Sequence, residues 1–134
     1  MLLSLKKRIF IVEDQAAVRE GIGEILNREP DLAVCGDAAD MNEALTGVFQ
    51  TDPDLVLADI QLGSSNGIEL IRELRQLYPG ITIIAMTMFD PVRHERQARA
   101  MGADGFVVKQ EGAESLLAVI RTTLMRNQSS VGLT

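Results

Sequence analysis

The chain has 134 residues, of which 46% are hydrophobic and 24% are charged, the ordinary balance of one globular domain with a single core. Its net charge of −6 argues against direct nucleic-acid binding by this chain, and it has no apolar run of about 18 residues that would cross a membrane. The single cysteine, Cys35, excludes an internal disulfide, and the short apolar start does not make a signal peptide, so we expect a cytoplasmic protein.

Strand-like and helical patterns alternate along the sequence. In chain order, we predict a strand at residues 9–12, a helix around 18–26, a strand at 32–35, a helix around 41–49, a strand at 55–58, a helix around 68–78, a strand at 81–86, a helix at 92–101, a strand at 106–108 and a helix around 116–124. The helices are predicted from apolar residues at helical spacing, for example Met41, Leu45, Val48 and Phe49. We expect Asp40 and Glu43 to form a capping box.

Two segments differ from this pattern. The apolar stripe of residues 92–101 is thin and consists largely of alanine, so we expect a weakly anchored helix there. Residues 127–134 are polar and show no periodicity. We therefore predict a domain over residues 1–126 that is followed by a C-terminal tail or the stub of a linker.

Alternating strands and helices predict the α/β class, with a doubly wound parallel sheet and helices on both of its faces. In such sheets, ligands bind at the edge where the carboxyl ends of the strands meet. Glu13 and Asp14 follow the first predicted strand, and Asp59 follows the third. Thr87 ends the fourth strand and Lys109 ends the fifth, so this edge would carry three acids, a hydroxyl and an amine.

These residues form a chemically consistent set if their strands are neighbours. Clustered acids repel one another unless a cation lies between them, and few acids together with a phosphate suit Mg²⁺, with Asp14 and Asp59 as ligands and Glu13 close by. Asp59 is then the candidate nucleophile for an aspartyl-phosphate, whose oxygens Lys109 and Thr87 would contact. Taken singly, the same residues also fit ordinary roles as helix caps, strand residues or solvated side chains.

The sequence closely resembles the receiver domain of two-component response regulators over residues 8–125. Residues 11–15 (IVEDQ) are similar to the family's acidic pair after the first strand, and residues 55–59 (LVLAD) resemble its phospho-acceptor strand. Residues 85–87 (AMT) are similar to the strand that carries the switch threonine. Residues 102–109 (GADGFVVK) are similar to the run that ends in the family's lysine.

The resemblance implies a fold and a mechanism. The sheet would have the flavodoxin-like strand order 2-1-3-4-5. A sensor histidine kinase would donate a phosphoryl group, and the chain would be no enzyme beyond assisting its own phosphorylation and dephosphorylation. The surface of the fourth helix, fifth strand and fifth helix would then change shape and select a partner. The implied site residues are Asp59 as phospho-acceptor, Glu13, Asp14, Asp59 and the Gln61 carbonyl as Mg²⁺ ligands, Lys109 beside the phosphate, and Thr87 and Phe106 as switch residues.

The sequence departs from the family pattern at several positions. Gly63 replaces the usual proline after the phospho-acceptor strand, which is expected to loosen that loop. Met88 and Phe89 stand where small or polar residues are common, and we hypothesise that they shield the phosphate from water and slow dephosphorylation. His94, the one histidine, is predicted to be a surface residue of the fourth helix and not a phosphorelay histidine.

Other functions fit the sequence less well. A degenerate receiver would act only as a docking or dimerisation module, and the complete set of site residues argues against it. A magnesium-dependent phosphohydrolase would have a second Asp where Gln61 stands. A flavin-binding domain would need a phosphate loop in place of the acids after the first strand.

The sequence leaves the output of the switch open. The run that ends in Lys109 and Gln110 favours regulators of transcription, whose output domain would be absent from this chain. A partner protein is the alternative recipient of the signal. A homodimer through the fifth and first helices, or through the face of the fourth helix, is a further open possibility.

Overall fold

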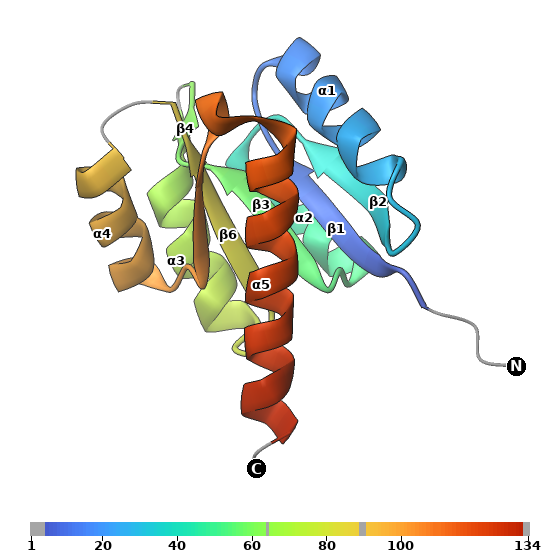
Figure 1. Cartoon of the computed structure of the whole chain (residues 1–134). Coiled ribbons are helices and arrows are strands. Elements are labelled where there is room, and N and C mark those ends of the chain that lie inside the picture. The colour runs from blue at the N-terminus through green and yellow to red at the C-terminus, as the bar shows by residue number, and fades with distance from the viewer. Residues whose placement is uncertain (1–4, 64, 89–90, 133–134) are drawn as a thin grey trace, which may run out of the picture.

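The computed structural model describes residues 5–63, 65–88 and 91–132 (Figure 1). Within these ranges, a five-stranded parallel sheet has the order β2-β1-β3-β6-β7. Its strands are β1 (Lys7–Val12), β2 (Leu32–Ala38), β3 (Leu55–Asp59), β6 (Thr82–Thr87) and β7 (Gly105–Val108). The predicted α/β class and the flavodoxin-like strand order are both confirmed. A small antiparallel pair, β4 (Gln61–Leu62) and β5 (Ser65–Asn66), was not predicted.

Helices connect the strands and cover both faces of the sheet. They are α1 (Ala16–Asn27), α2 (Met41–Thr51), α3 (Gly67–Leu77), α4 (Pro91–Met101) and α5 (Gly112–Gly132), and a short 3₁₀ turn, η1 (Lys109–Glu111), precedes α5. Helices α1 and α5 lie on one face, and α2, α3 and α4 lie on the other (Figure 1). This arrangement follows from right-handed crossovers between parallel strands whose order reverses beside β1.

The core has two halves because side chains alternate along each strand. In β1, Ile9 and Ile11 pack with α1 and α5, whereas Phe10 and Val12 pack with α2, α3 and α4. All four side chains are at most 1% exposed. The rigid sheet between two apolar layers fixes the positions of the residues that follow each strand.

The start of α2 confirms the expected cap. The Asp40 carboxylate accepts a hydrogen bond from the Glu43 N–H at 2.9 Å, and the Glu43 carboxylate accepts one from the Ala39 N–H at 3.0 Å. The apolar pattern of this helix is only partly a core pattern, since Phe49 is 78% exposed while Val48 is 1% exposed. A periodic apolar position does not ensure that another element covers it.

The C-terminal segment differs from the tail that its composition suggested. Helix α5 continues to Gly132, and the side-chain amide of Asn127 donates a hydrogen bond to the Thr82 hydroxyl at 2.7 Å. Its helical backbone hydrogen bonds and this contact with β6 explain order that apolar periodicity did not reveal. The placing of a domain boundary at residue 126 stays a prediction. In the part of the chain that the structure describes, no helix has the length and apolar character to span a membrane.

Candidate functional site

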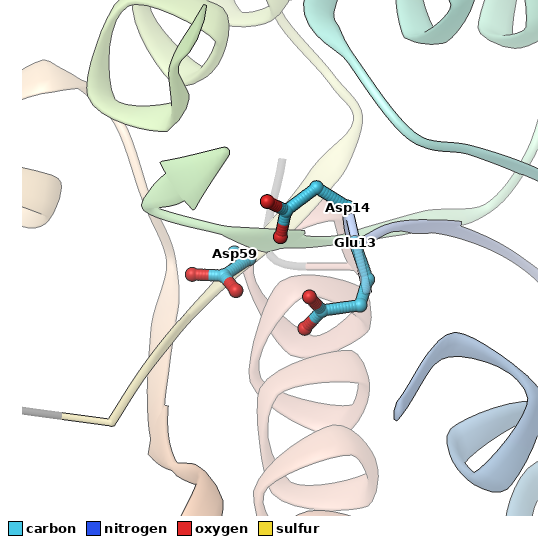
Figure 2. Close-up of side chains that lie close together, drawn as sticks. All are labelled: Glu13, Asp14 and Asp59. Carbon is cyan, nitrogen blue, oxygen red and sulfur yellow. The ribbon is translucent and has the colours of Figure 1, made fainter. Parts of the chain in front are cut away.

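Three acids meet at the carboxyl end of the sheet. Glu13 and Asp14 follow β1, and Asp59 is the last residue of β3. Because β1 and β3 are adjacent and parallel, with Val12 in register with Ala58, the acids come together although they are far apart in sequence. One carboxylate oxygen from each lies within 4.8 Å of the others, and Figure 2 shows the three side chains around a common space. This cluster was predicted from the places of the three acids at the ends of their strands.

The loop after Asp59 is shaped around its carboxylate. The Gln61 N–H donates a hydrogen bond to Asp59 Oδ1 at 2.8 Å, which fixes the orientation of the side chain. Gly63 has a φ of 60°, a left-handed conformation that proline cannot adopt and that most other residues avoid. The turn between β4 and β5 therefore requires glycine at this position. This requirement explains why glycine replaces the family's proline, in addition to the looser loop that the sequence predicted.

Gly67 allows α3 to begin directly behind the acidic site. A Cβ atom at this position would lie 2.1 Å from the Asp59 carbonyl oxygen and 2.5 Å from Ile60 Cα, which no side chain can tolerate. The Gly67 N–H donates a hydrogen bond to the Ile60 carbonyl at 3.2 Å, and Asn66 caps the helix through the Ile68 N–H at 2.9 Å. This close approach holds the Asp59 loop against the helix.

Lys109 brings the fifth strand of the sheet into the site. Its ammonium forms ion pairs with the carboxylates of both Glu13 and Asp59, and its side chain is only 12% exposed. Burial opposes the charged form of the lysine, but the hydrogen bonds to Asp59 and Glu13 outweigh it and raise the pKa of Lys109 above its ordinary value. A permanent positive charge therefore lies between two acids at neutral pH.

Glu13 is the most enclosed of the three acids. Its side chain is fully buried, and besides Lys109 its carboxylate accepts a hydrogen bond from the Gln15 N–H at 3.1 Å. The Glu13 carbonyl accepts a further hydrogen bond from Arg19 Nη1 at 2.8 Å. A buried charge with this many partners has a fixed position, so Glu13 orients Lys109 as well as contributing negative charge. The ion pair between Glu13 and Lys109 was not anticipated, because the two residues are neighbours only through the sheet.

An open cleft of about 560 Å³ lies over Asp59. Its lining includes Asp14, Gln61, Lys109 and Met88, so Met88 borders the space that a group attached to Asp59 would enter. Phe89, the second residue of the shielding hypothesis, lies outside the described residues.

The two expected switch residues lie in β6 and β7, the two strands beyond β3 in the sheet. Thr87 is fully buried at the end of β6, and Phe106 is partly buried in β7 against the core on the α3 and α4 side. The Thr87 hydroxyl hydrogen-bonds with His94 Nδ1 of α4 at 3.0 Å. His94 is thus half-buried and bonded to the sheet rather than a simple surface residue. In the sequence, this contact is indicated only by the place of His94 one turn into the helix that follows Thr87.

The donor set fits a hard divalent cation. Two oxygens bound to one Mg²⁺ ion lie at most about 4.2 Å apart. The three acids gather within 4.8 Å, so a small adjustment of flexible side chains would be enough. Asp14 is exposed and can move toward an ion, and Asp59 lines the cleft, whereas Glu13 is fully buried and is not among the described residues that line it. Gln61 also lines the cleft. The set therefore matches Asp14 and Asp59 as direct ligands better than Glu13.

The fold and the site together define a class of protein. A family model, the response regulator receiver domain, matches residues 9–121. A two-component response regulator of the LuxR family from Aurantimonas sp. SI85-9A1 superposes with a TM-score of 0.85 at 34% identity, over 90% of this chain and 86% of that one. A CheY-like receiver domain from Methanospirillum hungatei JF-1 has a TM-score of 0.84 at 29% identity, over 93% and 98%.

Two curated relatives of the sequence are named as regulators of transcription. The DNA-binding transcriptional activator DevR/DosR of Mycobacterium tuberculosis is 34% identical over 84% of this chain and 52% of its own length. The transcriptional regulatory protein YxjL of Bacillus subtilis, which is uncharacterized, is 32% identical over 87% and 53%. The chain belongs to the response regulator receiver domain family. It spans about half the length of these curated relatives.

Proposed function

We propose that this chain is a phospho-accepting receiver domain in which Asp59 takes a phosphoryl group from the phosphohistidine of a sensor histidine kinase. The observation that carries the proposal is the position of Asp59: its carboxylate opens into the cleft and is held by Lys109 and the Gln61 N–H beside two further acids. Membership of the receiver family supports the same function.

The transfer requires a nucleophile and charge neutralisation. One Asp59 carboxylate oxygen forms a bond to phosphorus, the phosphorus–nitrogen bond of the phosphohistidine breaks, and its electron pair leaves with the imidazole nitrogen, which takes up a proton. Lys109 keeps its ammonium charge and passes from the carboxylate to a phosphoryl oxygen. The Gln61 N–H holds the other carboxylate oxygen in place during the reaction.

The metal and switch assignments are part of the proposal. Asp14, Asp59 and the Gln61 carbonyl would hold Mg²⁺, with Glu13 nearby, and the bound ion would offset negative charge on the phosphoryl oxygens. After the transfer, the Thr87 hydroxyl would donate a hydrogen bond to a phosphoryl oxygen, and Phe106 would move into the space behind Thr87. The new charge of about −1.5 to −2 gives these residues a reason to change position.

The signal would then pass outside this chain. The relatives that it matches are transcription regulators about twice as long, which supports a DNA-binding output domain as its recipient. The net charge of −6 supports recognition of DNA by that domain and not by the receiver itself. A homodimer could present two such domains to DNA.

Intact-mass analysis tests the proposal directly. The protein is incubated with acetyl phosphate, with and without Mg²⁺, alongside Asp59→Asn and the matched control Asp37→Asn, an exposed acid of β2. One added phosphoryl group that requires Mg²⁺ and Asp59, and that persists in the control, is expected. A folded protein that gains no phosphoryl group would instead be a docking or dimerisation module.

A further inference from the structure

The hydrogen bond between Thr87 and His94 joins the carboxyl end of β6 to α4. The Thr87 hydroxyl and His94 Nδ1 are 3.0 Å apart, and Thr87 is fully buried. Among the described residues, the lining of the cleft over Asp59 includes Met88 but not Thr87. The hydroxyl is therefore engaged with α4 while its neighbour in sequence faces the site.

Helix α4 is lightly packed, which makes this bond important for its position. Of the residues Pro91–Met101, all of which are described, Ala98 alone is buried, and Val92 near the start is 73% exposed. The end of the helix has separate contacts, since Arg99 Nη1 donates to the Asp104 carbonyl at 3.1 Å. An element with so few buried apolar side chains changes position at low energetic cost.

We propose that His94 is a positioning residue that holds the Thr87 hydroxyl toward α4 until Asp59 is phosphorylated. This inference rests on the proposed function and specifies its regulation. The Thr87 hydroxyl has a single proton to donate. When the Thr87 side chain turns toward a phosphoryl oxygen on Asp59, its hydroxyl leaves the position in which it hydrogen-bonds with His94. Phosphorylation thus exchanges one hydrogen bond for another and releases the first half of α4.

The exchange links the chemistry at Asp59 to a surface of the molecule. Because the same bond restrains Thr87 and α4, whatever weakens it favours both the phosphorylated arrangement of Thr87 and a looser α4. A hydrogen bond of ordinary net strength biases such an equilibrium by about threefold to tenfold. Its removal should therefore produce an effect of that size on phosphorylation and on the protection of α4.

Two substitutions separate the hydrogen bond from the volume of the ring. His94→Leu removes the polar atoms, whereas His94→Asn keeps a polar atom near the place of Nδ1. Gln97→Ala, on the exposed side of α4, is the matched control. The rate of phosphorylation by acetyl phosphate with Mg²⁺ is measured for each, together with amide hydrogen exchange of residues 91–101 in the absence of any phosphodonor.

We expect His94→Leu to be phosphorylated about threefold to tenfold faster than the wild type and to exchange faster in residues 91–101 before any donor is added. His94→Asn and Gln97→Ala should stay within about twofold of the wild type. Thr87→Val removes the same bond from the other side, so it should raise exchange in α4 by itself and add little to His94→Leu.

Unchanged exchange and an unchanged phosphorylation rate in His94→Leu would overturn the inference, as would equal effects of the Leu and Asn substitutions. Failure of the proposed function is a separate result, namely no phosphoryl gain by the wild type. In that event the exchange data without donor still decide the question: if Thr87→Val and His94→Leu both leave α4 unchanged, the bond has no positioning role. If both loosen α4 non-additively, His94 holds Thr87 as proposed.

Discussion

At the scale of single residues, Lys109 determines how three acids coexist. Among the residues that the structure describes, Lys109 is the one whose positive charge contacts the carboxylates of both Glu13 and Asp59. Glu13 is fully buried and has no access to water that would stabilise its charge in place of the lysine. The site is thus held together by the group that the proposed mechanism moves onto the phosphate.

We expect Lys109→Met to destabilise the protein by about 3–5 kcal/mol, because it leaves two facing carboxylates without their cation. Urea unfolding of wild type and variant at several pH values measures this difference.

The contribution of Lys109 to stability depends on pH through its own raised pKa. Because the pKa of Lys109 is raised, its contribution to the free energy of unfolding is complete below the ordinary lysine value of 10.5 and is lost only as the pH rises through the folded pKa. A Lys109→Met variant that is as stable as the wild type at neutral pH would contradict the ion-pair explanation. Lys7→Met is the control, since Lys7 lies in the same sheet at the opposite end of β1.

Met88 is the residue expected to set the lifetime of the phosphorylated protein. Met88 lines the cleft over Asp59 and is 40% exposed. Replacement by alanine should admit water and shorten the lifetime about twofold to fivefold, which corresponds to about 0.5–1 kcal/mol in the barrier. Release of inorganic phosphate from the phosphorylated protein measures it, with Met101→Ala, 37% exposed and on α4, as the control. Equal lifetimes for Met88→Ala and wild type would remove Met88 from the shielding hypothesis.

At the scale of elements, Arg75 ties α3 to the end of α4 and to β6. Its guanidinium donates hydrogen bonds to the carbonyls of Gly102, Pro79 and Ile81 at 2.7–3.0 Å. It also pairs with Asp104 at 2.6 Å, and the same carboxylate oxygen accepts the Ile83 N–H at 2.9 Å. This network fixes the end of α4, so any movement of that helix on phosphorylation would be centred on its first half.

Arg75→Met should lower the free energy of unfolding by about 2–4 kcal/mol, because it leaves several partly buried carbonyls and the Asp104 carboxylate without donors. Arg72→Met on the same helix is the matched control. Arg72 pairs with Glu69 at the surface, where an ion pair contributes little, so this substitution should change stability only slightly. Denaturant unfolding compares the two variants, and equal losses would show that the Arg75 network has no special weight.

At the scale of the whole molecule, the acidic cluster couples metal binding to folding. A cation that binds the folded chain and not the unfolded one stabilises it by mass action, by about 1.4 kcal/mol at a tenfold excess over the dissociation constant. We expect Mg²⁺ to raise the midpoint of thermal unfolding, and Asp14→Asn to abolish this increase. Asp37→Asn should retain it, because Asp37 lies in β2 outside the cluster. An equal increase in wild type and Asp14→Asn would place the ion elsewhere.

The sequence by itself determined the class of fold and the residues that could form a site. Apolar periodicity is a local property, so the alternating strands and helices followed from neighbours along the chain, and the acids, Thr87 and Lys109 were recognised by their places at strand ends. The resemblance to receivers added the strand order and the roles of these residues. Those roles are still predictions, whereas the fold is confirmed.

Only the tertiary structure decided which of these residues touch. Lys109 meets Glu13 across 96 positions of sequence because both strands belong to one sheet, and Arg75 meets Asp104 across 29. The exposure of Phe49, the left-handed turn at Gly63 and the order of residues 127–132 likewise depend on what packs nearby. The bond between Thr87 and His94 is of this kind, since the path of α4 across the sheet determines which side chain reaches the hydroxyl.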